Sequence, residues 1–206
     1  MNIESGKKEL FFRLLSKNLE SEGFKYIKSR NLLVQKKPEG TFEIKYTSWP
    51  MFLQVETKIR IYLTRVEKHK KNAWGDKYYK YSTVGQARGY FYEKPELAVL
   101  PTDTLQNVKR AVDLEMNFFQ KKAKPFFDTF SEIIFLDKSL NDNPSNPSWI
   151  NFNPIQSSFT AMVVAKLMSR ENLPGIFDAH LDQIVNFNAQ FEEKGKMLRK
   201  YLLENI

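Results

Sequence analysis

Hydrophobic side chains recur at helical spacing near the start of the chain. The apolar positions of residues 7–22, among them Phe11, Leu15 and Leu19, fall three or four residues apart. Side chains at this spacing share one face of a helix. Gly23 follows directly, and glycine is a common helix stop. The pattern therefore predicts an amphipathic helix that buries one face and ends before Gly23.

After this helix the pattern changes to alternation, which is typical of strands. Short apolar runs at 26–27 and 32–34 predict two strands, and residues 42–46 alternate between apolar and polar side chains. The clearest alternation runs from 52 to 61, with one apolar and one charged face. A last strand is predicted at 84–92. Together these segments predict an antiparallel meander of about five strands.

Residues 65–81 separate the last two predicted strands and follow neither pattern. Five lysines between residues 68 and 80 stand against one acidic residue, Asp76, so that this stretch carries a net charge of +4. Because no period is evident, the sequence predicts a basic loop between strands.

The second half of the chain returns to helical spacing. The expected elements are a helix from 101 to 125, a very apolar helix at 126–136, a Pro- and Asn-rich loop at 139–156, a buried helix at 159–173 and a long last helix after 175. Strands followed by helices indicate an α+β fold. We expect an N-terminal helix, the meander, and a helical C-terminal half packed on the sheet. Residues 1–206 would form one domain, with a basic helix-plus-sheet half at 1–100 and a mainly helical half at 101–206.

Charge and composition narrow the possible functions. The 206 residues include 32 Lys and Arg, 24 Asp and Glu and no Cys, for a formal net charge of +8. The absence of cysteine excludes disulfide scaffolds, cysteine-ligated zinc and thiol nucleophiles. Residues 1–100 carry a net charge of +9, whereas residues 101–206 carry −1. No secretory leader or membrane span is evident, which predicts a cytoplasmic protein.

The basic charge is interleaved with aromatic side chains, and this combination suggests a binding surface. The candidate partner-binding residues are Lys68, Lys70, Lys71, Trp74, Lys77, Tyr78, Tyr79, Lys80, Tyr81 and Arg88. An acidic protein would be attracted by the cations and anchored by Tyr and Trp. Nucleic acid is the alternative partner, because phosphates attract cations and bases stack on aromatic rings. The same composition also arises without a binding partner, because aromatic residues pack well in strands and lysines protect exposed strand edges from association.

The sequence offers little catalytic chemistry. It contains no nucleotide-binding, cofactor-binding, metal-binding or nucleophile motif, so no catalytic residue, cofactor or metal ligand is assigned. Glu56 and Lys58 have the acid-x-Lys spacing of magnesium-dependent nucleases, although about three such triplets are expected by chance from this composition. His180 is predicted to lie on a helix surface. His69 has cationic neighbours that disfavour its protonation and no motif to orient it as a base.

Four segments resemble a family of uncharacterised bacterial α+β domains. They are Glu22-Gly23-Phe24-Lys25, Phe52-Leu53-Gln54-Val55, Lys124-Pro125-Phe126-Phe127-Asp128-Thr129-Phe130 and Ala165-Lys166-Leu167-Met168-Ser169-Arg170. The likeness covers most of the chain as a pattern, without an invariant motif. It implies a small cytoplasmic bacterial protein of the accessory or toxin-immunity kind and assigns no catalytic residues. With the charge pattern, it favours a non-enzymatic protein that binds an acidic macromolecule.

Overall fold

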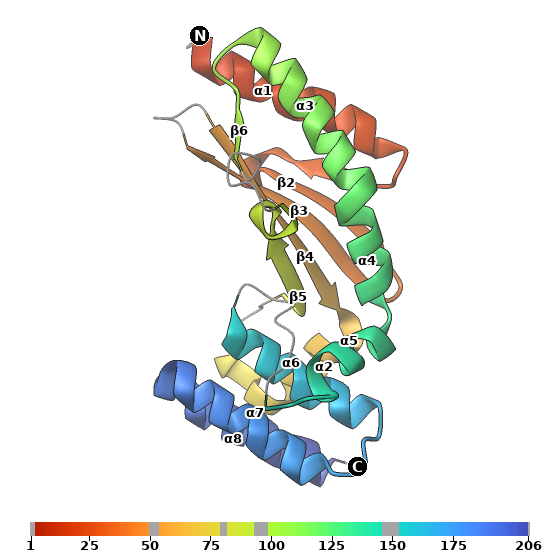
Figure 1. Cartoon of the computed structure of the whole chain (residues 1–206), viewed down its shortest axis with the longest axis vertical. Helices are drawn as coiled ribbons and strands as arrows, with labels where there is room; N and C mark the ends of the chain where they lie inside the picture. Colours follow the sequence, from red (N-terminus) through yellow and green to blue (C-terminus); the bar gives the residue numbers. More distant parts are fainter. Residues whose placement is uncertain (1–2, 50–53, 79–81, 93–98, 146–152, 206) are drawn as a thin grey trace. The chain divides into compact units, whose positions relative to one another are not determined.

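The computed structural model has the α+β class that the sequence predicts (Figure 1). It describes residues 3–49, 54–78, 82–92, 99–145 and 153–205. Contacts within the chain divide it into two compact units. The first unit comprises Met1–Lys37, Thr41–Arg60 and Gln86–Asp128, and the second comprises Pro38–Gly40, Ile61–Gly85 and Thr129–Ile206. That residues 1–206 fold as one domain stays a prediction.

An antiparallel sheet forms from the predicted meander and one further short strand. The strands are β1 (Lys25–Ile27), β2 (Leu32–Lys37), β3 (Gly40–Trp49), β4 (Gln54–Leu63), β5 (Val84–Ala87) and β6 (Val99–Pro101). They follow the order β1-β2-β3-β4-β5, and β6 also pairs with β4. Tyr26 lies opposite Leu33 between β1 and β2, and Val55 lies opposite Leu100 between β4 and β6. The alternation predicted for β4 is confirmed, because Val55, Thr57 and Ile59 are buried between half-buried polar neighbours.

Two helices of the first unit, α1 (Ile3–Glu20) and α3 (Leu105–Phe118), lie side by side against the sheet (Figure 1). The ring of Phe11 on α1 meets Tyr46 on β3 edge to face, with ring centroids 5.8 Å apart. Phe127 contacts Phe42 in the same way at 5.5 Å. Aromatic side chains therefore fill the layer between the helices and the sheet, where edge-to-face contacts are favourable.

The predicted helix break at Pro125 is wrong. Helix α3 continues through a π-helical turn, η6 (Phe119–Ala123), into α4 (Lys124–Ser131). Proline has no N–H for the helical hydrogen bond, and its ring crowds the carbonyl four residues earlier. A π-turn widens the helix at this point and lets the chain remain helical on both sides of Pro125.

The second unit is built mainly from five helices. They are α2 (Thr64–Trp74), α5 (Ile133–Asn141), α6 (Pro154–Leu167), α7 (Leu173–Asn188) and α8 (Glu192–Glu204). Every residue from 155 to 165 of α6 is buried, which confirms a buried helix in this region, although it begins at Pro154 and ends at Leu167 rather than spanning 159–173. Helix α6 packs against the other four helices. Within the described residues, no helix is both long and apolar enough to cross a bilayer.

Several boundaries in the second half differ from the prediction. The apolar helix at 126–136 is two helices, because Glu132 between α4 and α5 adopts an extended conformation. The long last helix is broken at Asn188, whose side chain accepts a hydrogen bond from the Gln190 amide. An Asn side chain that bonds nearby backbone competes with helix continuation. The loop at 139–156 is shorter than predicted and contains residues 146–152, which lie outside the described residues.

The short helical turns complete the structure. They are η1 (Lys28–Arg30), η3 (Gly75–Lys77), η4 (Arg88–Phe91) and η7 (Ala189–Phe191). The strand predicted at 84–92 therefore ends at Ala87 and continues as η4.

Candidate functional site

The basic loop predicted at 68–80 is wrong, because most of it is helix α2 followed by η3. Lysine, arginine and alanine favour helix, and Glu67 in the first turn and Lys71 in the last turn complement the helix dipole. Gly75 ends the helix with a φ of 51°, a left-handed value that glycine adopts without strain. Lys68, Lys70 and Lys71 therefore lie on a helix, and Lys77 lies on η3.

One face of α2 is buried, and it includes two of the candidate binding residues. Val66, Lys70 and Trp74 lie four residues apart and so share one helix face. Trp74 is 3% exposed, meets Phe159 of α6 at 5.0 Å between ring centroids, and donates from Nε1 to the Lys194 carbonyl at 3.0 Å. Trp74 is thus a core residue that joins α2 to α6 and α8, which corrects its assignment as a partner anchor.

Lys70 is buried for a different reason. Its ammonium lies 2.5 Å from the Glu67 carboxylate, and only 1% of its side chain is exposed. Glu67 also accepts hydrogen bonds from Tyr78 at 2.8 Å and Thr83 at 2.9 Å. A buried charge requires such a partner, because its transfer from water is costly. Lys70 therefore does not present its charge to a partner, and its assignment to the binding surface is also corrected.

The opposite face of α2 does present charge. Arg65, Lys68 and Lys71 are exposed at three-residue intervals along the helix, and Lys77 is exposed on η3. We call these four residues the cationic ridge. Among the described residues, no carboxylate forms an ion pair with any of them. The ridge keeps three predicted binding residues and adds Arg65, which belongs to the same helix face once α2 is recognised.

Of the remaining candidate residues on this segment, the structure describes only Tyr78. Tyr78 is half-buried, and its hydroxyl is bonded to Glu67. Burial, followed by the charge and hydrogen bond of Glu67, raises the pKa of the Tyr78 phenol far above its ordinary value. Tyr79, Lys80 and Tyr81 lie outside the described residues.

Arg88 lies in the first unit and is 1% exposed, so it too is corrected from surface to core. It forms a buried ion pair with Glu115 of α3, and the same carboxylate accepts hydrogen bonds from Tyr46 and Thr57, each at 3.2 Å. The Arg88 guanidinium also lies 4.9 Å from the centre of the Phe118 ring. Burial raises the pKa of Glu115 despite the adjacent guanidinium. This cluster connects the sheet to α3.

His69 lies beside the ridge on α2. Its Nδ1 is 3.4 Å from the hydroxyl of Tyr201 on α8, and Asn72 donates from Nδ2 to that hydroxyl at 3.2 Å. Burial, then the positive charges of Lys68, Arg65 and Lys166, lower the pKa of His69. The predicted effect of neighbouring cations on His69 is confirmed in direction, although burial is the larger cause.

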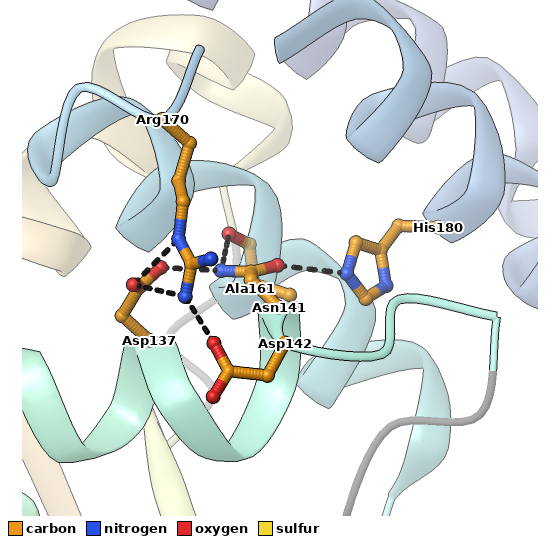
Figure 2. Close-up of polar contacts among 6 residues, drawn as sticks. All are labelled: Asp137, Asn141, Asp142, Ala161, Arg170 and His180. Carbon is orange, nitrogen blue, oxygen red and sulfur yellow. Dashed lines mark hydrogen bonds and ion pairs between the residues drawn. The ribbon is translucent and has the colours of Figure 1, made fainter. Parts of the chain in front are cut away.

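His180 is buried, so the prediction that it lies on a helix surface is wrong (Figure 2). Asn141 donates from Nδ2 to the Ala161 carbonyl at 3.1 Å and to the Asp137 carboxylate at 3.0 Å. These two acceptors orient the amide, so that Asn141 Oδ1 faces His180 Nε2 at 3.0 Å and accepts a hydrogen bond from its N–H. Burial lowers the pKa of His180 to about 4, and the Leu140 carbonyl offsets only part of this effect.

Arg170 continues this polar network toward the surface (Figure 2). Its Nε donates to Asp137 at 2.8 Å, and its Nη2 lies 2.5 Å from the Asp142 carboxylate. The network thus joins α5, α6, α7 and the turn after α6. His180 is 0% exposed and therefore has no access to a substrate, so we assign the network a structural role.

The structure provides little support for the nuclease hypothesis. Glu56 and Lys58 lie on one face of β4 and form an ion pair at 3.4 Å. Glu43, which has the same spacing to Lys45, is buried at 6% exposure. In the part of the chain that the structure describes, no three His, Asp or Glu side chains gather as a metal site.

Comparison with known proteins adds no relatives. No protein family, curated protein or solved structure matches the chain. The resemblance to a family of uncharacterised bacterial domains stays a prediction. Function is therefore inferred from the residues of the site alone.

Proposed function

We propose that the chain is a non-enzymatic binding protein that docks an acidic protein through the cationic ridge. The observation that carries the proposal is the local excess of charge on α2 and η3. Four exposed cations lie within residues 65–77, and none forms an ion pair with a described carboxylate. An unpaired cluster of this kind accelerates association with a partner of opposite charge. A toxin that the chain neutralises would be one such partner.

The positive charge is concentrated on α2 and η3, which favours an acidic protein over a nucleic acid as the partner. The second unit contains 13 basic and 12 acidic residues, so its net charge is only +1. A duplex is a long, uniformly negative track and would also meet the acidic residues of this unit. A single strand needs exposed aromatic faces, yet Trp74 is buried and Tyr78 is half-buried against Glu67. Nucleic acid remains the second candidate because phosphates would also be attracted to the ridge.

Fluorescence anisotropy with labelled polyglutamate, single-stranded RNA and duplex DNA tests the proposal at low and near-physiological salt. We expect polyglutamate to bind the wild type more tightly than either nucleic acid. Reversal of the ridge in Lys68→Glu/Lys71→Glu/Lys77→Glu should weaken that binding by about a hundredfold, since each reversed charge turns attraction into repulsion.

The matched control reverses three exposed cations of the first unit in Lys17→Glu/Lys36→Glu/Lys109→Glu. It changes the net charge of the chain by the same amount and should bind polyglutamate nearly as well as the wild type does. Equal losses in the two variants would show that net charge alone attracts the peptide and would overturn the ridge. Tighter, salt-sensitive binding of RNA or DNA would favour the second candidate.

A further inference from the structure

His69 lies beside the ridge and is held in a defined orientation by a hydrogen-bonded chain. Asn72 donates to the oxygen of Tyr201, which leaves the Tyr201 hydroxyl proton free to bond His69 Nδ1. When Nδ1 accepts a hydrogen bond in this way, the neutral imidazole carries its own proton on Nε2. That nitrogen has no hydrogen-bond partner among the described residues and is not among their buried unpaired atoms.

Cations on two helices lie near His69. Arg65 lies four residues before His69 on α2 and therefore occupies the same side of the helix, and Lys68 is its immediate neighbour. Lys166 comes from the last turn of α6, which packs against α2. The charges of Lys68, Arg65 and Lys166 all act on His69, and none of these residues has a carboxylate partner among the described residues.

We propose that His69, Arg65, Lys68 and Lys166 form a subsite that binds a carboxylate of the acidic partner. His69 Nε2–H would donate to one carboxylate oxygen, while the three cations supply the opposite charge. The inference rests on the proposed function and deepens it, because Lys166 and His69 lie outside the ridge. A neutral donor is suited to this position, since a fourth positive charge beside three others would be costly without a bound anion.

A carboxylate fits the subsite better than a nucleic acid phosphate does. The aromatic ring that adjoins it belongs to Tyr201, whose hydroxyl is engaged and whose ring centroid lies 5.9 Å from that of His69. The ring of Tyr201 is thus in contact with the imidazole on one side rather than standing free for a base. A short acidic segment needs no stacking surface and places its side-chain carboxylates directly on the donors.

The test combines a local probe with two variants that leave the ridge lysines in place. The full-length chain is labelled with ¹³C-histidine and titrated with polyglutamate near neutral pH, and the His69 imidazole signal is followed. His69→Phe keeps a ring but removes the donor, and Lys166→Gln removes the α6 cation. The control Lys36→Gln removes one exposed cation from the first unit.

We expect the His69 signal to shift and saturate as polyglutamate is added, with no shift when sodium chloride of equal ionic strength replaces it. His69→Phe and Lys166→Gln should each weaken polyglutamate binding about three- to tenfold, and Lys36→Gln should not. Tyr201→Phe should weaken binding less, because it loosens the imidazole without removing it.

Failure of the subsite is distinguishable from failure of the proposed function. If reversal of the ridge abolishes binding while His69→Phe and Lys166→Gln bind as the wild type does, the subsite is wrong and the ridge stands. If the wild type does not bind polyglutamate at low salt, both are overturned. A His69 shift produced by RNA or DNA and not by polyglutamate would refute the carboxylate assignment.

Discussion

Acidification should destabilise the second unit through His180. This imidazole is fully buried, and its Nε2–H donates to Asn141 Oδ1 (Figure 2). Burial lowers its pKa from 6.5 to about 4. Between these two values the unfolded chain binds a proton that the folded chain does not bind. Stability contributed by the neutral histidine is therefore present above about pH 6.5 and is lost progressively down to about pH 4.

The size of the effect follows from linkage. A pKa difference of this size corresponds to about 3 kcal/mol across the whole window, and about 2 kcal/mol of it falls between about pH 7 and pH 5. The variant His180→Gln retains an N–H donor for Asn141 and does not titrate. Urea unfolding of both proteins at the two pH values, followed by circular dichroism, gives the free energy of unfolding.

The comparison between the two proteins isolates His180. Surface carboxylates with lowered pKa values also contribute stability that is lost in acid. These residues, Glu9, Glu22 and Asp103, are the same in both proteins, so their effect cancels in the comparison. The wild type should lose about 2 kcal/mol more than His180→Gln on going from about pH 7 to pH 5. Equal losses would refute the reasoning, as would an NMR titration that places the His180 midpoint near 6.5. His69→Gln is the control, because it leaves the His180 contribution unchanged.

Three further variants and one exposed-face control test the packing. Arg88→Met should cost about 3 to 5 kcal/mol in the free energy of unfolding, because it leaves the Glu115 carboxylate buried without its cation; a cost below about 1 kcal/mol would contradict the buried ion pair. Lys70→Gln should cost about 2 to 3 kcal/mol, whereas Lys68→Gln on the exposed face should cost less than about 0.5 kcal/mol. Gly40→Ala should cost about 2 kcal/mol by thermal unfolding, because a Cβ at this position would lie too close to the Tyr62 carbonyl oxygen; a neutral result would mean that this backbone shifts easily.

The sheet was predictable because its signal is local. Along β4 every second side chain is buried, so the alternation of Val55, Thr57 and Ile59 is visible in the sequence alone. Helix α1 is equally clear, since Phe11, Leu15 and Leu19 form a continuous apolar stripe. In both elements the buried side chains are apolar or small, so their burial can be predicted from residue type.

Helix α2 was missed because its buried stripe contains a charge. Between Val66 and Trp74 the stripe passes through Lys70, and a lysine at the central position hides the helical period. Burial of Lys70 depends on the carboxylate of Glu67, whose other bonds come from Tyr78 and Thr83. Propensity alone would have indicated a helix, because the segment is rich in Lys and contains Glu and Ala. The Glu67–Lys70 pair is local, three residues apart on α2, but the packing of α2 against α6 and α8 that buries it has no sequence signal.

The misplacement of His180 has the same origin. On sequence, a histidine between Asp178 and Asp182 suggests a solvated helix, and both aspartates are indeed exposed. The opposite face of α7 is buried, and His180 lies on it. The hydrogen bond to Asn141, which lies nearly forty residues earlier in the chain, stabilises the buried imidazole. A polar residue whose only partner is distant in sequence cannot be placed by local periodicity.

Net charge is therefore a poor guide to where this chain exposes cations without carboxylate partners. Lys70 and Arg88 contribute to the +9 of residues 1–100, yet each is buried and neutralised by a carboxylate. The first unit carries a net charge of +7 and the second only +1, although the ridge belongs to the second. What attracts a partner at close range is the density of exposed cations without a carboxylate beside them, because screening removes the distant ones. Variants with the same net charge but with cations reversed on different surfaces therefore distinguish a binding site from a generally basic composition.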